Sequence, residues 1–434
     1  AHSRWAFFPS FSVGYRISEE KFFEPLKPVI SDMKIRGSYG LIGNQNVGAG
    51  RFIPTMTTAS VSWLVDGARV LYTGLPANVS SDLFWEDIAT LDIGADIRFF
   101  NNRYGITFDW FQRENRNMLS VGETLPETFG TSAAMVNDGR LRTRGWEVTI
   151  DGSHTFPNGL SLYANVNVSD YQSVITEWNA NSGNLLTSNY KGKTIGEIWG
   201  FETDRYFTSD EDVASSPSQV GLQTGNFVYG PGDIKYKDLN GDGVINAGSS
   251  TLADHGDLKK IGNTTPRYQY SFRIGGAWKG FDVDLYFQGI GSRQLWATGN
   301  EAIPYFRGAD VMYQHQMDFW SPENPDAKYP LPYTGNGTSA ISGMRYMANA
   351  AANSGNNFYP QTKYLLNLSY LRLKNLTIGY TLPDNITRRA NISKARIYFS
   401  GENLFEFSQK KIPIDPEITA PFERILSFGV QLTM

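Results

Sequence analysis

Apolar and polar side chains alternate with a period of two residues along most of this 434-residue chain. Between Trp5 and Ile17, for example, the odd positions are almost all apolar, and most even positions are small or polar. The same alternation returns at 33–41, 83–99, 104–110, 146–151, 160–169, 267–274, 281–288 and 426–434. Because successive side chains of a β-strand point to opposite faces, this pattern predicts about a dozen strands with one apolar and one polar face.

One predicted strand changes phase near its middle. Leu371 and Leu373 lie on one parity of the sequence, whereas Leu376 and Ile378 lie on the other. A β-bulge inserts one extra residue into a strand, so a bulge near Asn375 would return all these apolar side chains to one face.

The connections between the predicted strands have two lengths. Tight turns are expected at 100–103, 156–159 and 277–280, and long polar stretches occupy 42–82, 120–138, 171–194, 208–265 and 291–362. A soluble sandwich or jelly roll also alternates. Long strands, aromatic residues near strand ends and a charged second face nevertheless favour a membrane barrel. The predicted fold is therefore all-β, an antiparallel transmembrane β-barrel with short periplasmic turns and long extracellular loops.

Composition excludes several classes of function. The chain has no Cys, which rules out disulfides and a Cys nucleophile, and its four His do not have metal-ligand spacing. The formal net charge of -4 argues against nucleic-acid binding. Aromatic residues make up 14% of the chain although its mean hydropathy is -0.34, a combination that suits a sheet with one apolar face.

The segment DLNGDG, at 238–243, matches the first six positions of a calcium-binding loop. Position 12 of that pattern is Ser249 rather than the Glu of an EF-hand, which excludes the EF-hand itself. The oxygens that could still bind Ca²⁺ or Mg²⁺ are those of Asp238, Asn240, Asp242 and the Val244 carbonyl, completed by Asp254 or Asp257. The alternative is a tight turn built by Asx side chains and two glycines, and both interpretations remain open.

No catalytic residues are predicted. The paired carboxylates Glu86/Asp87 and Asp282/Asp284 have no recognisable acid–base partner, so an enzyme is not expected, and no cofactor is required. The substrate-binding residues are unknown. Four loop aromatics either stack on sugar rings or fill interface belts and loop cores: Trp63, Trp178, Trp199 and Tyr206.

Eleven ordered segments resemble the SusC/RagA group of TonB-dependent outer-membrane transporters. They are FFPSFSVGY (7–15), MKIRGSYGLIGNQ (33–45), LFWEDIATLDIGADIRFFNNRYGITFDWF (83–111), NDGRLRTRGWEVTI (137–150), PGDIKYKDLNGDGVIN (231–246), IGNTTPRYQYSF (261–272), GFDVDLYFQGIGS (280–292), FWSPENPDAKYP (319–330), SYLRLKNLTIGYTLP (369–383), GENLFEFS (401–408) and DPE (415–417). The segments span nearly the whole chain and follow the order of the group.

This resemblance implies TonB-energised import of a bulky nutrient, an oligosaccharide or oligopeptide, across the outer membrane of a Gram-negative bacterium. Such transporters have a barrel of roughly 22 strands, an N-terminal plug, a TonB box and a SusD-like lipoprotein over the mouth. Residues 1–434 hold about a dozen predicted strands and no recognisable plug or TonB box. The chain is therefore expected to be the C-terminal portion of a longer barrel, whose missing part contacts the TonB complex. A passive porin and a structural or adhesive barrel remain alternatives.

The resemblance and the alternation together predict the surroundings of each face and loop. The remainder of the same barrel and the lipid bilayer are expected partners, because unpaired strand edges are not tolerated in lipid. Loops 42–82, 208–265 and 291–362 are the expected docking site of the SusD-like lipoprotein. Expected to face lipid are Phe11, Ile93, Phe108, Val148, Val166, Phe272, Leu285 and Val430. Expected to face the lumen or plug are Arg16, Asp92, Glu147, Asn167, Arg273 and Asp284.

Overall fold

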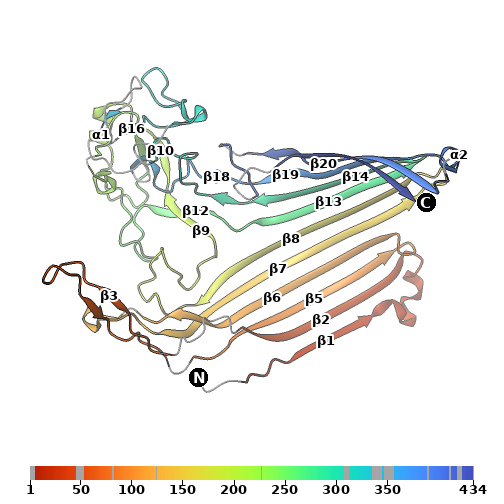
Figure 1. Cartoon of the computed structure of the whole chain (residues 1–434), viewed down its shortest axis with the longest axis horizontal. Coiled ribbons are helices and arrows are strands. Elements are labelled where there is room, and N and C mark those ends of the chain that lie inside the picture. Colours follow the sequence, from red (N-terminus) through yellow and green to blue (C-terminus); the bar gives the residue numbers. More distant parts are fainter. Residues whose placement is uncertain are drawn as a thin grey trace. The chain divides into compact units, whose positions relative to one another are not determined.

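A large antiparallel sheet is the main feature of the chain (Figure 1). The computed structural model describes residues 5–44, 53–80, 83–123, 125–225, 227–306, 312–334, 345–346, 356–388, 391–409, 412–417 and 423–433. The sheet has eleven strands, and its order follows the chain: β1 (Ser10–Arg16), β2 (Ile30–Asn44), β5 (Glu86–Phe99), β6 (Tyr104–Val121), β7 (Met135–Thr155), β8 (Ser161–Glu177), β13 (Arg267–Trp278), β14 (Phe281–Ser292), β19 (Tyr370–Thr381), β20 (Lys394–Ser408) and β21 (Ile425–Thr433).

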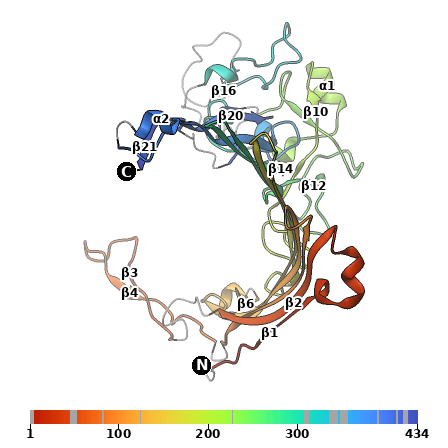
Figure 2. The same cartoon turned by 90° about the vertical axis from the view of Figure 1, so that its right-hand side faces the viewer.

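The described residues form two compact units, each of which contains part of the sheet. Unit 1 comprises 1–150 and 169–195, and unit 2 comprises 151–168 and 196–434. In unit 1, β5 and β6 are joined by the tight turn at 100–103. The connection before β5 contains a hairpin of β3 (Thr58–Ser60) and β4 (Leu71–Thr73), which extends away from the strands of this unit (Figure 2).

Unit 2 shows the same contrast between short and long connections. Trp278 pairs with Phe281 across a two-residue turn, and both turn residues, Lys279 and Gly280, have positive φ, as a hairpin turn of this kind requires. The connection between β19 and β20 contains α2 (Asp384–Thr387). The two longest connections hold β9 (Glu197–Phe201), β10 (Thr203–Tyr206), α1 (Asp210–Ser215), η4 (Val220–Leu222), β11 (Ile234–Tyr236), β12 (Leu258–Asn263), β15 (Gln294–Leu295), η5 (Gln314–Gln316), β16 (Tyr333–Thr334), β17 (Arg345–Tyr346), η6 (Asn356–Phe358) and β18 (Leu366–Asn367).

Strand register in unit 1 separates the side chains into the two predicted sets. Phe11 lies opposite Tyr39, which lies opposite Leu91, so these residues share a face with Ile93. Phe108 lies opposite Ala95 on that face. Phe11 and Ile93 are exposed, as expected of a face that contacts lipid rather than a protein core.

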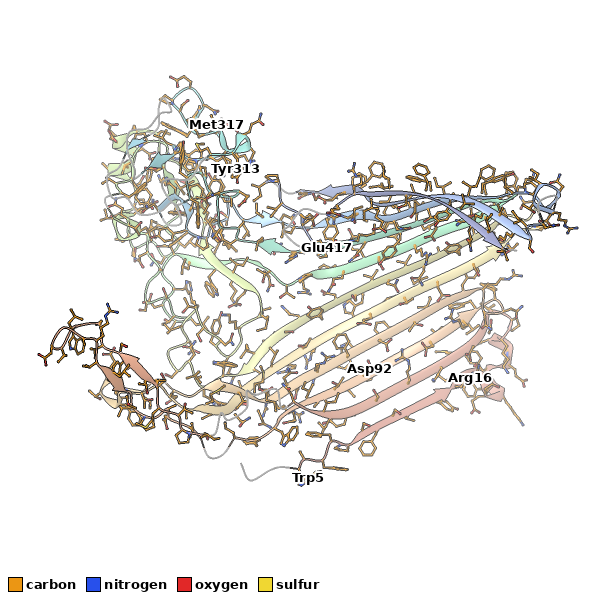
Figure 3. All side chains as sticks on the ribbon, in the orientation of Figure 1. Trp5, Arg16, Asp92, Tyr313, Met317 and Glu417 are labelled. Carbon is orange, nitrogen blue, oxygen red and sulfur yellow. The ribbon has the colours of Figure 1, made fainter. Side chains whose placement is uncertain are left out.

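Ion pairs connect neighbouring strands on the opposite face. Arg36 of β2 lies 3.5 Å from Asp92, 3.2 Å from Asp96 and 2.6 Å from Asp109, and thereby joins three strands. Arg16 donates to Asp32 at 2.8 Å. Arg16 and Asp92 are labelled in Figure 3. Because these charges have partners on neighbouring strands, this part of the face can be both polar and ordered.

The two faces are equally distinct in unit 2. Phe272 lies opposite Phe287, and Leu285 lies opposite Leu376. On the polar face, Arg273 donates to Asp284 at 2.7 Å. Val430, another residue predicted to face lipid, lies opposite Ile397.

The predicted β-bulge is confirmed in β19. The register of β19 against β14 shifts between Leu373 and Asn375, which makes Lys374 the extra residue in that pair. Against β20 the register also shifts there, but the additional residue lies in β20, between Glu402 and Phe405. Leu373 then lies opposite Phe287 and Leu376 opposite Leu285, so the apolar residues before and after the shift share one face. No helix within the described residues is long and apolar enough to cross a membrane.

A charge placed on the apolar face tests the assignment of the faces. Phe108→Lys is expected to destabilise the folded protein by about 2–4 kcal/mol, because the lysine would lie in the hydrocarbon region. Thr107→Lys is the control: Thr107 is on the opposite face and donates to Asp96 at 3.2 Å, so a cation there keeps an anionic neighbour. The measurement is urea unfolding of the full-length polypeptide in phosphatidylcholine vesicles, and equal destabilisation by both variants would contradict the assignment.

Candidate functional site

The two longest connections of unit 2 fold together into a loop module, defined here as residues 196–266 and 293–369 (Figure 1). Its main hydrophobic core takes residues from both connections. The buried members are Phe201, Tyr206, Phe207, Leu222, Phe227, Tyr229, Ile234, Tyr236, Ile245, Trp320 and Ala327. The module therefore has the kind of core that a soluble domain has, although it is built from loops.

Three buried amides hold the two connections together. Asn357 accepts a hydrogen bond from the Ile234 amide at 2.8 Å and donates to Asp233 at 2.7 Å. Asn356 accepts from the Thr224 amide at 3.0 Å. These amides and Gln361 form what we call the amide clamp; all three are at most 1% exposed. A buried polar group without a partner is costly, so the clamp fixes one arrangement of the two connections.

Gln361 completes the amide clamp at the edge of the core. Its amide nitrogen donates to the Asn357 carbonyl at 2.7 Å and to the Tyr236 hydroxyl at 3.2 Å, and its side-chain oxygen accepts from Thr203 at 2.8 Å. Tyr236 in turn donates to the Asn356 carbonyl at 2.8 Å. The clamp is thus a connected network rather than a set of separate bonds.

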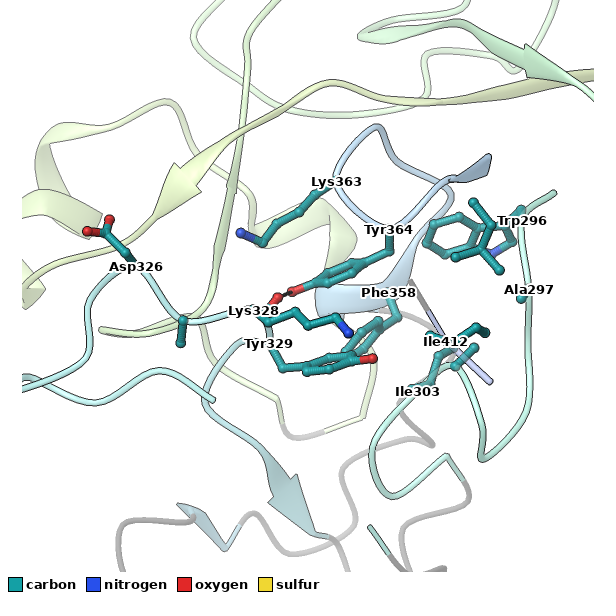
Figure 4. A pocket seen from close by; sticks show the side chains of 13 residues that line it. Trp296, Ala297, Ile303, Asp326, Lys328, Tyr329, Phe358, Lys363, Tyr364 and Ile412 are labelled. Carbon is teal, nitrogen blue, oxygen red and sulfur yellow. Dashed lines mark hydrogen bonds between the residues drawn. The ribbon is translucent and has the colours of Figure 1, made fainter. Parts of the chain in front are cut away.

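A cavity of about 340 Å³ lies beside this core (Figure 4). Its walls are mostly aromatic and aliphatic, with two lysines and one carboxylate. They are formed by Trp296, Ala297, Ala302, Ile303, Asp326, Ala327, Lys328, Tyr329, Phe358, Lys363, Tyr364, Leu366 and Ile412. Pockets of this size and chemistry bind small molecules or single side chains of a larger ligand, which makes it the candidate binding site of the chain.

Three aromatic rings packed together make one wall of the cavity. Tyr329 and Tyr364 have centroids 5.7 Å apart and planes only 9° from parallel, and Phe358 lies 5.2 Å from Tyr364. The Tyr364 hydroxyl donates to the Lys328 carbonyl at 3.0 Å. The Lys363 ammonium lies 4.4 Å from the centroid of the Tyr206 ring, in cation–π contact. This wall presents flat apolar surface with cations close by.

Burial controls the ionisation of these tyrosines. It raises the pKa of Tyr329 to about 12, and it raises the pKa of Tyr364 well above its usual value. Burial also raises the pKa of Tyr206. All three hydroxyls therefore stay protonated at neutral pH. Those of Tyr206 and Tyr364 donate to the backbone carbonyls of Ala327 and Lys328, which suits a binding role.

Ion pairs fasten the outer side of the module. Glu202 accepts from Lys237 at 2.6 Å and also from Lys259, and these hydrogen bonds lower the pKa of Glu202 to about 2. Hydrogen bonding from Arg205 likewise lowers the pKa of Asp212. Both carboxylates are ionised throughout the neutral range and hold neighbouring strands of the module.

The structure places the predicted cation ligands in one tight turn. Asp238 accepts hydrogen bonds from the amides of Gly241 at 2.6 Å and Gly243 at 2.9 Å. Asp242 accepts from the Val244 amide at 2.8 Å, and Asn240 accepts from the Asp242 amide at 3.0 Å. These are the bonds that the Asx-turn interpretation requires.

Asp257 and Asp254 support neighbouring turns. The buried Asp257 accepts from the amides of Leu239 at 2.7 Å and Asn246 at 2.9 Å, and Asp254 accepts from the Ser249 amide at 2.9 Å. Within the described residues, no group of three or more His, Asp or Glu side chains could hold a metal ion. The predicted set also uses an amide and a carbonyl oxygen, so cation binding at this turn stays a prediction.

The four loop aromatics have different environments. Tyr206 belongs to the module core, and the Trp178 ring lies against Gly139. Trp199 packs 5.4 Å from the His255 ring, whereas Trp63, on the β3–β4 hairpin, is 64% exposed. The paired carboxylates take part in structural contacts: Asp282 accepts from Arg396, Asp284 from Arg273, Glu86 from the Leu119 amide and Asp87 from Asn117.

Sequence reasoning missed a second cluster, centred on Arg372 of β19. This side chain is 3% exposed and contacts Glu406, Asp415 and Glu417, two of which belong to the DPE segment. Arg293 donates to the Glu417 carbonyl at 3.1 Å. The segment Ile412–Glu417 is thereby fastened to the polar face of unit 2, where Glu417 is labelled in Figure 3. A DPE triplet alone carries no sequence signal for such a contact.

Comparisons with known proteins show that the chain is similar to TonB-dependent receptors. No family model matches. The chain is 25% identical over 424 residues to "TonB-dependent receptor P3" of Formosa agariphila, covering 94% of this chain and 38% of the relative. It is 24% identical to "TonB-dependent receptor SusC" of Bacteroides thetaiotaomicron, covering 100% and 40%. The chain thus spans about two fifths of the length of these curated relatives.

A solved structure supports the fold. The chain superposes on one titled "Structure of the RagAB peptide transporter" with a TM-score of 0.70 and 20% identity, covering 98% of this chain and 43% of that one. The resemblance to the SusC/RagA group is therefore confirmed. The fold is all-β and antiparallel, similar to part of the barrel of such a transporter.

The amide clamp can be tested by one substitution. Asn357→Ala removes the acceptor of the buried Ile234 amide and one of the donors to Asp233, so we expect opening of the module to become easier by about 1–3 kcal/mol. Hydrogen exchange of the module amides in the full-length polypeptide is the measurement. Gln223→Ala, which removes a half-buried amide from the same module, is the control and should change exchange little. Equal increases in hydrogen exchange in the two variants would show that the amide clamp does not stabilise the module more than an ordinary half-buried amide does.

The response of the DLNGDG segment to a chelator distinguishes a cation site from an Asx turn. Because Asp238 already fixes the amides of Gly241 and Gly243, their exchange protection should persist in EDTA and disappear in Asp238→Ala. Asp210→Ala, in the first turn of α1, removes a carboxylate elsewhere in the module and serves as control. Protection that is lost in EDTA and restored by Ca²⁺ would instead establish the cation site.

Proposed function

We propose that this chain is the C-terminal portion of an outer-membrane barrel that imports a bulky nutrient, energised through TonB, in a Gram-negative bacterium. The observation that carries the proposal is the two-faced sheet: one face is apolar and exposed, and the other is lined by paired charges. Such a sheet suits a wall between lipid and a wet lumen. The similarity to TonB-dependent receptors supports the same role.

The loop module is proposed to bind the cargo at the mouth of the barrel. Its cavity offers the stacked Tyr329 and Tyr364 rings together with the Lys328 and Lys363 ammonium groups. Aromatic faces stack on sugar rings or on apolar side chains of a peptide, and ammonium groups attract carboxylates. The cargo class is therefore an oligosaccharide or an oligopeptide. The protein in the similar solved structure is titled a peptide transporter, which favours peptides for the first trial.

A SusD-like surface lipoprotein is the proposed partner, with loops 42–82, 208–265 and 291–362 as its docking surface. The described part of the first loop, 53–80, carries an unusually apolar hairpin whose exposed residues include Trp63, Leu64 and Leu71. Exposed aromatic and aliphatic side chains gathered on one projecting hairpin are typical of protein interfaces. Residues 45–52, 81–82, 307–311, 335–344 and 347–355 of these loops lie outside the described residues.

Uptake and co-purification test the proposal together. In cells that express the full-length polypeptide, import of a labelled oligopeptide mixture should stop when TonB is deleted. Trp63→Ser with Leu64→Ser should release the lipoprotein during purification from outer membranes while the barrel remains folded. As a control, Ile386→Ser changes an exposed apolar residue of α2, which lies outside these three loops. Uptake that continues without TonB would favour a passive porin instead. A protein that is present in the outer membrane but supports no uptake would favour a structural barrel.

A further inference from the structure

The apolar face of unit 1 ends sharply along two adjacent strands. In β6, Tyr104, Ile106, Phe108 and Trp110 are followed on the same parity by Gln112, Glu114 and Arg116. Register keeps this parity on one face, because Ile93 lies opposite Trp110 and Leu91 lies opposite Gln112. The strand therefore continues past Trp110 with polar residues on the face that is apolar below it.

The same face of the next strand, β7, also changes from apolar to polar residues, and there the polar residues are arginines. On β7, the apolar residues Ile150, Val148 and Trp146 are followed on the same parity by Arg144, Arg142 and Arg140. Contacts with β6 place these arginines on the same face: Arg144 donates to Gln112 at 2.7 Å, and Arg142 lies 3.9 Å from Glu114. We call Arg140, Arg142 and Arg144 the arginine ladder.

The arginine ladder begins where the apolar runs of the two strands end. From Tyr104 to Trp110 the apolar run extends over roughly 20 Å along the strand, at about 3.4 Å per residue. The run ends at a tryptophan, as expected where an apolar band is bordered by aromatic residues. The tight turn at 100–103 is at the other end of β6, so the ladder is on the side of the long loops.

The positive charge of the ladder is only partly balanced. Arg140 is 3.6 Å from Glu177, and the Glu114 carboxylate near Arg142 is already bound by Arg116 at 3.0 Å. Arg144 donates to a neutral amide oxygen. The side chains of Arg140 and Arg142 are 46% and 36% exposed, so their guanidinium groups can reach a ligand.

We propose that the arginine ladder binds the phosphate groups of a glycolipid in the outer leaflet of the membrane. Guanidinium groups bind phosphate with two parallel hydrogen bonds, and alternate positions on a strand repeat at about 7 Å, which lets neighbouring arginines hold one headgroup. Trp110 and Trp146 lie where the acyl chains of the same lipid begin. The ladder continues the lipid-facing surface of the strands, and that continuity identifies a lipid as the occupant. The inference rests on the proposed outer-membrane location.

The test uses bisphosphorylated lipid A and its dephosphorylated form as probes. Binding to the full-length polypeptide, purified in detergent, is measured by native mass spectrometry for the wild type and for R140Q/R142Q/R144Q. We expect at least tenfold weaker binding of bisphosphorylated lipid A by the triple variant, and weak binding of the dephosphorylated lipid by both proteins. R113Q is the matched control: it removes the same charge from β6, but Thr90 lies opposite it on the polar face, so binding should be unchanged.

Several outcomes would overturn the inference. Equal binding by the triple variant, equal binding of dephosphorylated lipid, or displacement of the lipid by millimolar inorganic phosphate would each exclude a glycolipid site. A triple variant that binds lipid normally but loses self-association would assign the ladder to an interface between copies. If the triple variant does not fold, R144Q alone carries the test.

Uptake separates this inference from the proposed function. Loss of lipid binding in the triple variant with TonB-dependent uptake intact supports the ladder as a lipid site and leaves the transport proposal standing. Lipid binding that depends on the arginines in a protein without uptake would support the ladder while contradicting the transport proposal.

Discussion

The need to pair every backbone amide and carbonyl inside a membrane determines most of this structure. Lipid offers no hydrogen-bond partners, so a chain that crosses it as strands must pair each strand with a neighbour. The pairing in chain order from β1 to β21 meets this need with hairpins alone. It also fixes which side chains share a face, and the ion pairs around Arg36 follow from that arrangement. Even the bulge at Lys374 is a consequence, because without it the apolar residues of β19 would be divided between lipid and lumen.

The same constraint explains what could be predicted from the sequence. Alternation is a local signal repeated in every strand, so the strands, their faces and the bulge near Asn375 were all predictable. The amide clamp was not, since Asn357 and Asp233 are 124 residues apart and neither belongs to a periodic pattern. Arg372 was missed for a related reason: it lies in an ordinary strand, and only the folded DPE segment shows which carboxylates surround it.

The candidate site was predictable only in part. The DLNGDG turn was visible because Asx and Gly residues at fixed spacing have a local structural meaning, and its internal hydrogen bonds match that expectation. The cavity was not visible, because its walls come from distant residues of the β14–β19 connection, such as Tyr329 and Tyr364, and from Ile412 of the β20–β21 connection. Tyr206 was identified as an aromatic of interest, but its role in the core depends on neighbours from the other connection. Loop sequences thus predict local turns more readily than they predict cavities whose walls are formed by residues distant in the sequence.

The amide clamp also has a consequence for the order in which the chain assembles. The hydrogen bonds that it makes between the two connections join residues separated by 120 to 158 positions, and the hairpin of β13 and β14 lies between them in the sequence. Contacts of such high order form late, since the entropy of closing the intervening chain must first be overcome. The module therefore closes only after both connections have emerged at the same end of the sheet. A chain whose strands paired in the wrong register would hold Asn357 away from Asp233, and the module would lose the hydrogen bonds that join its two connections.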